Sequence, residues 1–341
     1  MDRRPLPRRR GILRQLIRPY DPPTRCGRTR RRGDRLPFSG ALSGPTMPRH
    51  RDRGRSDGES MGSTGFRLTD QHIAHFNTFG YLGFPGLLAD RADAIIDAFE
   101  EVWAGRGGGH DRKPHAGVAR SCIVPFIDQH EYLCSLLDDP RILAIEKALL
   151  GDDFNYMGSD GNYYVGDTGW HSDGWHDGIT HIKIAFYLDP LTRDTGALRV
   201  MPGSHMRGAP YADDVMEKIG RCQDEWGLAP DEVPAVALET NPGDIVLFNH
   251  NTKHAAFGGG KRRRMFTINT CERYPESRLQ ELRDYVGGAS RFWIDRVHGE
   301  KMVATADAER LVHLEQVRAN DGHLAELSAA ARERMAEPSR G

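Results

Sequence analysis

The sequence lacks an apolar run long enough to cross a bilayer, because none approaches the roughly 18–20 residues that a membrane helix needs. It also lacks a P-loop, a GxGxxG fingerprint and internal repeats, so nothing in it supports nucleotide chemistry. Cysteine is scarce, with five scattered residues and no CxxC pair, which predicts reduced thiols in a cytoplasmic protein. What the 341 residues do contain, 38% hydrophobic and 28% charged residues, is typical of a globular protein with a substantial core.

The net charge of −1 hides an uneven distribution along the chain. Residues 1–60 contain 17 Arg or Lys against 6 Asp or Glu, whereas the rest contains 30 against 42. The first segment is rich in Pro and Gly and has no periodic apolar pattern, so we predict a disordered leader over residues 1–62. Aromatic residues do not interleave with its basic ones, so we predict no nucleic-acid partner. The leader has no apolar segment of the kind that a secretory signal needs, and its prolines and aspartates argue against a transit peptide. We expect the true translation start at Met47 or Met61.

Residues 63–341 are predicted to form one domain, with helices around a β-rich core. Thr69 suits a helix N-cap and Gly80 a helix stop, and apolar residues recur at helical spacing up to about residue 105 and again from 139 to 150. Short β-rich runs bounded by Gly, Pro, Asn and Asp follow between about 154 and 274, and helical patterns return after them. The pattern predicts a mainly β fold with flanking α-helices, whose core is an antiparallel sandwich or barrel.

The stretch WHSDGWHDG, residues 170–178, contains the first candidate ligands. His171 and Asp173 are two positions apart, so an extended backbone places both side chains on one side. An HxD pair alone is a weak signal, but His254 follows a strand expected at 244–248 and supplies a second imidazole. Two histidines and one carboxylate on one face, with three positions open, form the facial triad that suits non-haem Fe(II). Arg263 opens the next predicted strand, where a guanidinium can hold a carboxylate by two hydrogen bonds.

The motifs GWHSD, GALRVMPGSH, PGDIVLFNHNTKHAAF and RRRMFTIN occur in that order along the chain. With them, residues 66–274 resemble the phytanoyl-CoA dioxygenase-like branch of the Fe(II)/2-oxoglutarate-dependent oxygenases. The resemblance implies a double-stranded β-helix, which is a cupin-like jelly roll, and a reaction that uses Fe(II), 2-oxoglutarate and O2. That reaction couples oxidative decarboxylation of 2-oxoglutarate, to succinate and CO2, to oxidation of a small molecule. Halogenating relatives carry a small residue where this chain has Asp173, so the resemblance favours hydroxylation or desaturation.

The same resemblance implies roles for individual residues. His171, Asp173 and His254 would hold the iron, and Arg263 would bind the 5-carboxylate of 2-oxoglutarate. The two neighbouring arginines, at positions 262 and 264, fit the family spacing loosely as well. Asn162 matches a position that often contacts 2-oxoglutarate.

Several assignments near the HxD motif have competing interpretations. His250 lies four residues before His254, and alignment of the motif favours His254 as the ligand and His250 as a hydrogen-bonding turn residue. Trp175 and His176 are candidate substrate contacts, although His176 also suits a polar loop at the pocket mouth or, together with His181, a second metal site. A cupin-like protein that binds metal without 2-oxoglutarate turnover is the alternative function. Acyl-CoA, ectoine-like, phosphonate and secondary-metabolite substrates are all compatible with the sequence, as are a monomer and a homodimer.

Overall fold

The computed structural model describes residues 65–341. The predicted leader and both candidate start sites, Met47 and Met61, lie outside these residues. The helices are α1 Asp70–Phe79, α2 Ala92–Gly105, α3 Glu131–Cys134, α4 Pro140–Leu150, α5 Pro210–Lys218, α6 Cys222–Trp226, α7 Leu279–Gly287, α8 Glu300–Ala304, α9 Ala308–Asn320 and α10 Leu324–Arg334. The strands are β1 Tyr81–Phe84, β2 Ser121–Ile123, β3 Asn155–Tyr164, β4 Thr168–His171, β5 His181–Tyr187, β6 Leu198–Val200, β7 Val236–Leu238, β8 Ile245–Asn249, β9 His254–Ala256 and β10 Arg263–Cys271.

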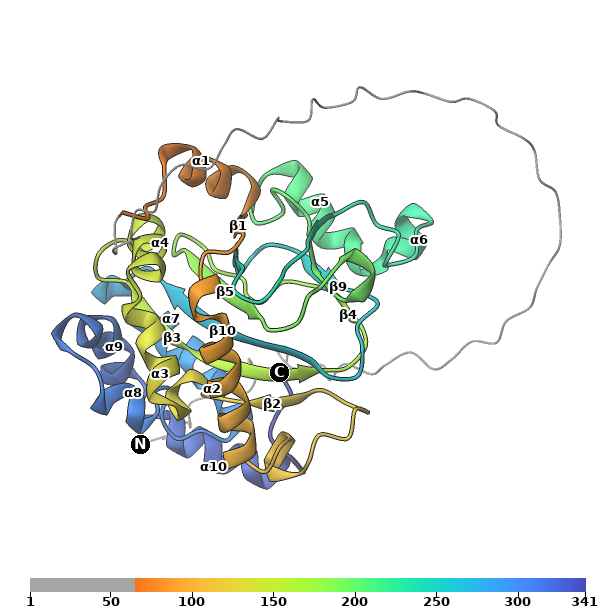
Figure 1. The fold of residues 1–341 in the computed structure, drawn as a ribbon. Coiled ribbons are helices and arrows are strands. Elements are labelled where there is room, and N and C mark those ends of the chain that lie inside the picture. The colour runs from red at the N-terminus through yellow and green to blue at the C-terminus, as the bar shows by residue number, and fades with distance from the viewer. Residues whose placement is uncertain (1–64) are drawn as a thin grey trace, which may run out of the picture. The chain divides into compact units, whose positions relative to one another are not determined.

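The strands form two antiparallel sheets (Figure 1). The larger has the order β1-β8-β5-β10-β3-β2 and the smaller the order β4-β9-β6-β7. From β3 to β10 the chain alternates between the two sheets, except that β6 and β7 pair with each other in the smaller one. This topology is a double-stranded β-helix, or jelly roll, so the predicted mainly β fold with flanking helices is confirmed.

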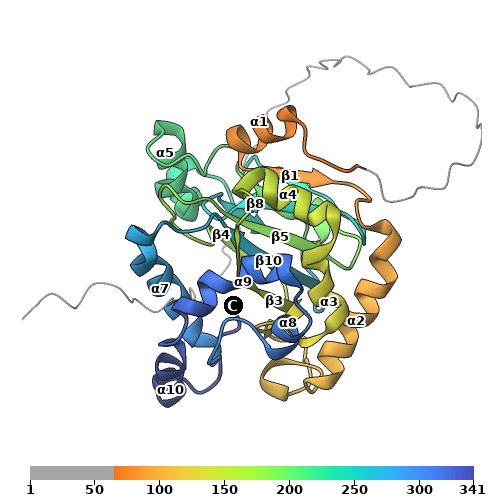
Figure 2. The ribbon, with the colours of Figure 1, turned by 90° about the vertical axis from the view of Figure 1, so that its left-hand side faces the viewer.

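Strand β5 shows how the two faces of the larger sheet are used. Ile182, Ile184 and Phe186 belong to the outer core, which they share with side chains of α2, α3, α4 and α9. Figures 1 and 2 show these helices, together with α8, on that side of the sheet. Ala185 and Tyr187, at the alternate positions, join an inner core with side chains of β6, β8 and β10. The two-residue period of a strand therefore directs β5 partly towards the helices and partly into the jelly roll.

The helix boundaries follow the predicted caps. Thr69 accepts a hydrogen bond from the backbone of His72, and Gly80 ends α1 in the left-handed region with φ 82°. Asp139 caps α4 in the same way through the backbone N–H of Arg141. The segment between β6 and β7 was not predicted to be helical, yet it contains α5 and α6. Its apolar residues pack in a small cluster of their own beside Trp170, which explains why no long periodic pattern marked these helices.

Within the described residues, no helix is both long and apolar enough to span a membrane. The cysteines of this part of the chain are buried free thiols, at positions 122, 134, 222 and 271. Burial raises the pKa of the Cys122 and Cys134 thiols to about 12, so both are protonated at neutral pH. Cys134, Cys222 and Cys271 pack in apolar clusters of the core.

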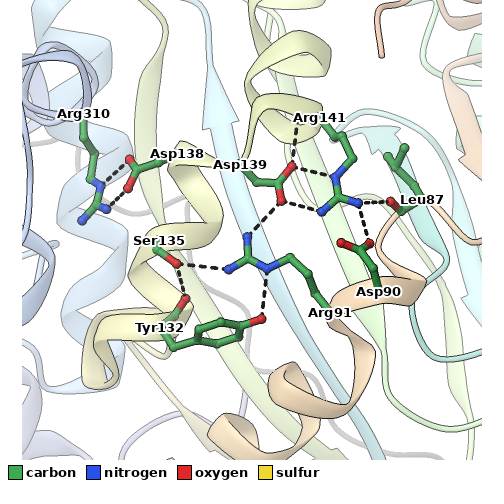
Figure 3. A network of polar contacts seen from close by, with 9 residues as sticks. All are labelled: Leu87, Asp90, Arg91, Tyr132, Ser135, Asp138, Asp139, Arg141 and Arg310. Atoms are coloured by element: carbon green, nitrogen blue, oxygen red, sulfur yellow. Dashed lines mark hydrogen bonds and ion pairs between the residues drawn. The ribbon is translucent and has the colours of Figure 1, made fainter. Parts of the chain in front are cut away.

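A buried ion-pair network joins the N-terminal helices (Figure 3). Asp139, whose side chain is 4% exposed, lies 2.9 Å from Arg91 Nη1 and 2.7 Å from Arg141 Nη2. Arg91 also donates to the Tyr132 hydroxyl, and Arg141 extends the network to the exposed carboxylate of Asp90. Because two guanidinium groups share one carboxylate that also caps α4, the network fixes how α2, α3 and α4 pack.

Replacing Asp139 by asparagine is expected to destabilise the fold. Burial alone would raise the pKa of this carboxyl, but hydrogen bonds from Arg141 and Arg91 lower it to about 2. A lowered folded-state pKa adds stability above the unfolded pKa near 4, amounting to about 2 kcal/mol at pH 7 and lost as pH falls towards 2. Urea unfolding at several pH values measures this, and the difference between Asp139→Asn and the unchanged protein is expected to shrink below pH 4. Asp90→Asn is the matched control, because Asp90 pairs with the same Arg141 at an exposed position.

Candidate active site

The jelly roll brings the three predicted metal ligands together. His171 ends β4 and His254 begins β9, and the two residues are direct partners in the antiparallel pairing of these strands. Asp173 follows in the loop after β4, where the backbone N–H groups of Asp173 and Gly174 donate to the carbonyl of His250. Asp173 Oδ1 lies 3.8 Å from His171 Nε2, and Oδ2 lies 3.6 Å from His254 Nε2. One ligand atom from each residue therefore falls within 4.8 Å of the others.

Backbone carbonyls orient both imidazoles of this cluster. His171 Nδ1–H donates to Gly169 at 2.8 Å, and His254 Nδ1–H donates to Thr252 at 2.9 Å. The proton is thereby held on Nδ1 in both rings, and each Nε2 presents its lone pair towards Asp173. Burial lowers the pKa of His254 to about 3, so this ring is neutral at physiological pH. The donor set and its tautomers fit a divalent transition metal such as Fe(II).

Lys183 is a charged neighbour that the sequence analysis missed. It lies on β5, two residues before Ala185 on the inner face, and its Nζ is 2.8 Å from Asp173 Oδ2. Burial by itself would raise the pKa of Asp173, but the charge of Lys183 holds it well below its usual range. The signal was present in THIKIAFYL, because a lysine in the middle of an apolar strand has to meet an opposite charge when it is buried.

The structure separates the roles of the three consecutive arginines. Arg262 pairs with Glu100, and Arg264 pairs with Asp189 and Glu100. Arg263 instead is 5% exposed, and within the described residues its Nε and Nη1 have no hydrogen-bond partner. Its guanidinium lies 5.1 Å from the ring centre of Tyr164.

Two glycines make room for this guanidinium. A Cβ atom on Gly196 or Gly259 would lie 2.0 or 2.5 Å from Arg263 Nη1, so no other residue fits at these positions without displacing the arginine. A buried, unpaired guanidinium is costly, and an anionic ligand such as a carboxylate would satisfy it.

Asn162 lies on β3 in a polar wall of the same interior. Its Oδ1 accepts a hydrogen bond from Arg120 Nε at 2.8 Å, and its Nδ2 donates to Asp160 at 2.6 Å. Arg120 also lies 3.4 Å from Asp160. The amide that was predicted to contact 2-oxoglutarate is thus held by two charged neighbours, and Arg120 and Asp160 are further residues that no motif identified.

The second half of WHSDGWHDG does not belong to the triad. Trp175 is 56% exposed, with Lys253 and Arg207 over its ring. His176 is half-buried and stacks on His181, with ring centres 3.4 Å apart. His250 forms the turn through its backbone, as predicted, but neither nitrogen of its buried ring has a partner in the described part of the chain. Its imidazole is therefore not the hydrogen-bonding group that the sequence analysis expected.

The fold and the site define a jelly-roll protein with two histidines and one carboxylate on one face. A sequence model of the phytanoyl-CoA dioxygenase (PhyH) family matches residues 76–265, which is more than half of the chain and includes the triad and Arg263. The chain belongs to this family, as the sequence resemblance indicated.

Individual relatives are more distant. Dioxygenase lolE1 of Epichloe uncinata is 26% identical over 142 residues, which are 38% of this chain and 50% of that protein. An uncharacterised protein of Mycobacterium tuberculosis is 32% identical over 108 residues, which are 32% of this chain and 33% of that protein. The chain thus spans half or less of these curated relatives.

Among solved structures, the 2-oxoglutarate-dependent carbocyclase SnoK has a TM-score of 0.48 and 21% identity, covering 60% of this chain and 84% of that one. EctD of S. alaskensis has a TM-score of 0.47 and 22% identity, covering 62% and 80%.

Proposed function

We propose that this protein is an Fe(II)- and 2-oxoglutarate-dependent dioxygenase that hydroxylates or desaturates a small molecule. The observation that carries the proposal is the combination of the His171–Asp173–His254 cluster with the buried guanidinium of Arg263, whose Nε and Nη1 have no hydrogen-bond partner in the described residues. A metal cluster alone would suit a cupin-like protein without redox turnover. The unpaired arginine in the same interior favours an enzyme that also binds a carboxylate co-substrate.

Each residue has a distinct role in this proposal. His171 and His254 would hold the metal through Nε2, and Asp173 would hold it through a carboxylate oxygen. Lys183 holds Oδ2 of Asp173 and so orients the carboxylate. Arg263 binds the 5-carboxylate of 2-oxoglutarate by two hydrogen bonds. When bound, Fe(II) with 2-oxoglutarate and O2 supplies the oxidation of substrate, with succinate and CO2 as the co-products.

The wider organisation is part of the same proposal. Residues 63–341 act as one oxygenase domain, the protein works in the cytoplasm, and it is a monomer or a homodimer. Trp175, exposed beside the site, and Asn162, in the polar wall, are the proposed contacts to substrate and 2-oxoglutarate respectively.

A spectroscopic experiment tests the activity before the substrate is known. Anaerobic protein mixed with Fe(II) and 2-oxoglutarate is expected to show a weak visible metal-to-ligand charge-transfer band, which is absent when either component is left out. Admitting O2 is then expected to produce succinate, at a rate that rises when a panel of small metabolites includes the substrate. A cupin-like protein without 2-oxoglutarate turnover would give neither the band nor succinate, and this result would refute the proposal.

A further inference from the structure

A second cluster of histidines lies beside the triad. His176 is in the loop after β4, His181 begins β5, and His250 follows β8. One nitrogen from each ring falls within 4.8 Å of the others, and the clusters share no residue. We propose that His176, His181 and His250 form a second transition-metal site, of the kind that binds Zn(II). The sequence indicates only the pair His176 and His181, and the fold adds His250.

The hydrogen bonding of these rings is incomplete without a ligand. His181 and His250 are 1% and 2% exposed. Within the described residues, His176 Nε2, His181 Nδ1 and both ring nitrogens of His250 are buried without a partner. Buried polar groups are normally satisfied, and each one left unpaired costs about 1–3 kcal/mol. A single metal ion would engage one nitrogen of all three rings.

Neighbouring groups hold the ligands as they do in known metal sites. His181 Nε2 lies 2.8 Å from the buried hydroxyl of Tyr274. In the tautomer that donates Nε2–H to this hydroxyl, the lone pair is on Nδ1, which faces the cluster. Asn251 fixes the backbone of His176 on both sides, since its Oδ1 accepts from His176 N–H and its Nδ2 donates to His176 C=O. Two of the three ligands are thus anchored by side chains outside the cluster.

Binding requires one ring to turn. His176 and His181 are stacked with their planes 5° apart, and a metal ion lies close to the plane of each imidazole that binds it. The two rings therefore cannot bind the same ion in the stacked arrangement. His176 is the ring able to move, because it is on the loop and half-buried, whereas His181 is held by Tyr274. The ring lies against Gly174, where only glycine fits beside it, since a Cβ atom there would lie 2.3 Å from His176 Nε2.

The ligand set determines the class of metal. Three neutral imidazoles without a carboxylate suit Zn(II), Cu(II), Ni(II) or Co(II) better than Mg(II) or Ca(II), which prefer oxygen. Three histidines leave the fourth position of a tetrahedral zinc ion open to water or to an oxygen atom of a ligand. The triad differs in having Asp173, so the two sites can be emptied separately by substitution.

Zinc stoichiometry after dialysis tests the proposal in the full chain. The unchanged protein is expected to retain about two zinc ions per chain, one at each cluster. His176→Asn is expected to reduce this to one, Asp173→Ala to one, and the double variant to none. His323→Asn is the matched control, because His323 is half-buried between α9 and α10, away from both clusters, and it is expected to leave two.

Crystals of the unchanged protein grown with Zn(II) give a test that needs no variant. The anomalous difference map is expected to show a peak about 2.0–2.1 Å from one nitrogen of each ring, with the His176–His181 stack opened. A zinc content that His176→Asn leaves unaltered, or a map without this peak, would overturn the second site. Neither result depends on 2-oxoglutarate or on turnover, so failure of this inference is distinguishable from failure of the proposed oxygenase activity.

Discussion

An Asp173→Ala protein is expected to bind Fe(II) more than about 100-fold more weakly than the unchanged chain, because loss of even an outer-sphere partner costs 10–100-fold. The charge-transfer band with 2-oxoglutarate and the succinate yield should disappear with it. His171→Ala is expected to have the same effect on iron binding, since His171 Nε2, 3.8 Å from Asp173 Oδ1, is another ligand of the same proposed site. Iron affinity can be measured anaerobically by competition with a chelator.

The two substitutions should differ in the protein without metal. Asp173 Oδ2 lies 2.8 Å from Lys183 Nζ, and both side chains are less than a fifth exposed. Removing one partner of a buried ion pair leaves a buried charge, at a cost of about 3 kcal/mol or more. The His171 side chain is 41% exposed, and within the described residues its ring hydrogen-bonds only to the Gly169 carbonyl, so its loss should change stability little.

Unfolding of metal-free protein therefore separates the two functions of this carboxylate. Asp173→Ala should unfold at lower urea concentration than the unchanged chain, and His171→Ala close to it. Asp177→Ala, four positions further along the same loop and exposed, is the control expected to retain both iron binding and stability. Iron binding that survives in Asp173→Ala would show that the triad is not the metal site.

The sequence alone was sufficient for the parts of this site that lie on regular strands. His171, His254 and Arg263 stand at the ends of β4, β9 and β10, where strand periodicity and turn residues indicate both position and direction. That these residues would meet was implied by the resemblance of the ordered motifs to the family. The sequence pattern could not distinguish Arg263 from its two neighbours. The distinction depends on tertiary contacts, since Arg262 pairs with Glu100 and Arg264 with Asp189.

The residues that sequence analysis missed depend on contacts between distant segments. Lys183 meets Asp173 only because β5 lies in the larger sheet opposite the end of β4. His250 joins His176 and His181 because a turn after β8 packs on the loop after β4. These contacts follow from the jelly-roll topology, and the local sequence pattern does not indicate them. Helices α5 and α6 were missed for a related reason, since they are short and pack only locally.

Replacing Arg263 by methionine is expected to weaken 2-oxoglutarate binding about 100-fold, which corresponds to about 3 kcal/mol for a bidentate, charge-assisted pair. Fe(II) affinity should be unchanged, because Arg263 is outside the triad. Titration of 2-oxoglutarate into the anaerobic Fe(II) protein, followed by the charge-transfer band, measures the first affinity, and competition with a chelator measures the second. Arg262→Met is the matched control, since Arg262 is half-exposed and already paired with Glu100.

The same substitution is expected to raise the stability of the protein without ligands. In the free protein Arg263 is 5% exposed and its Nε and Nη1 have no hydrogen-bond partner in the described residues, with the Tyr164 ring as partial compensation. Exchanging an unpaired buried charge for an apolar side chain of similar length removes that cost. Urea unfolding should therefore show Arg263→Met to be more stable than the unchanged chain when both lack 2-oxoglutarate.

Addition of 2-oxoglutarate with Fe(II) should reverse this order. A ligand that binds only the folded state adds stability in proportion to the logarithm of its concentration over Kd, so the unchanged chain gains and Arg263→Met does not. A variant that is less stable without ligand and binds 2-oxoglutarate normally would show that Arg263 has a structural role. The expected reversal instead indicates that Arg263 lowers the stability of the ligand-free fold and binds the carboxylate of 2-oxoglutarate.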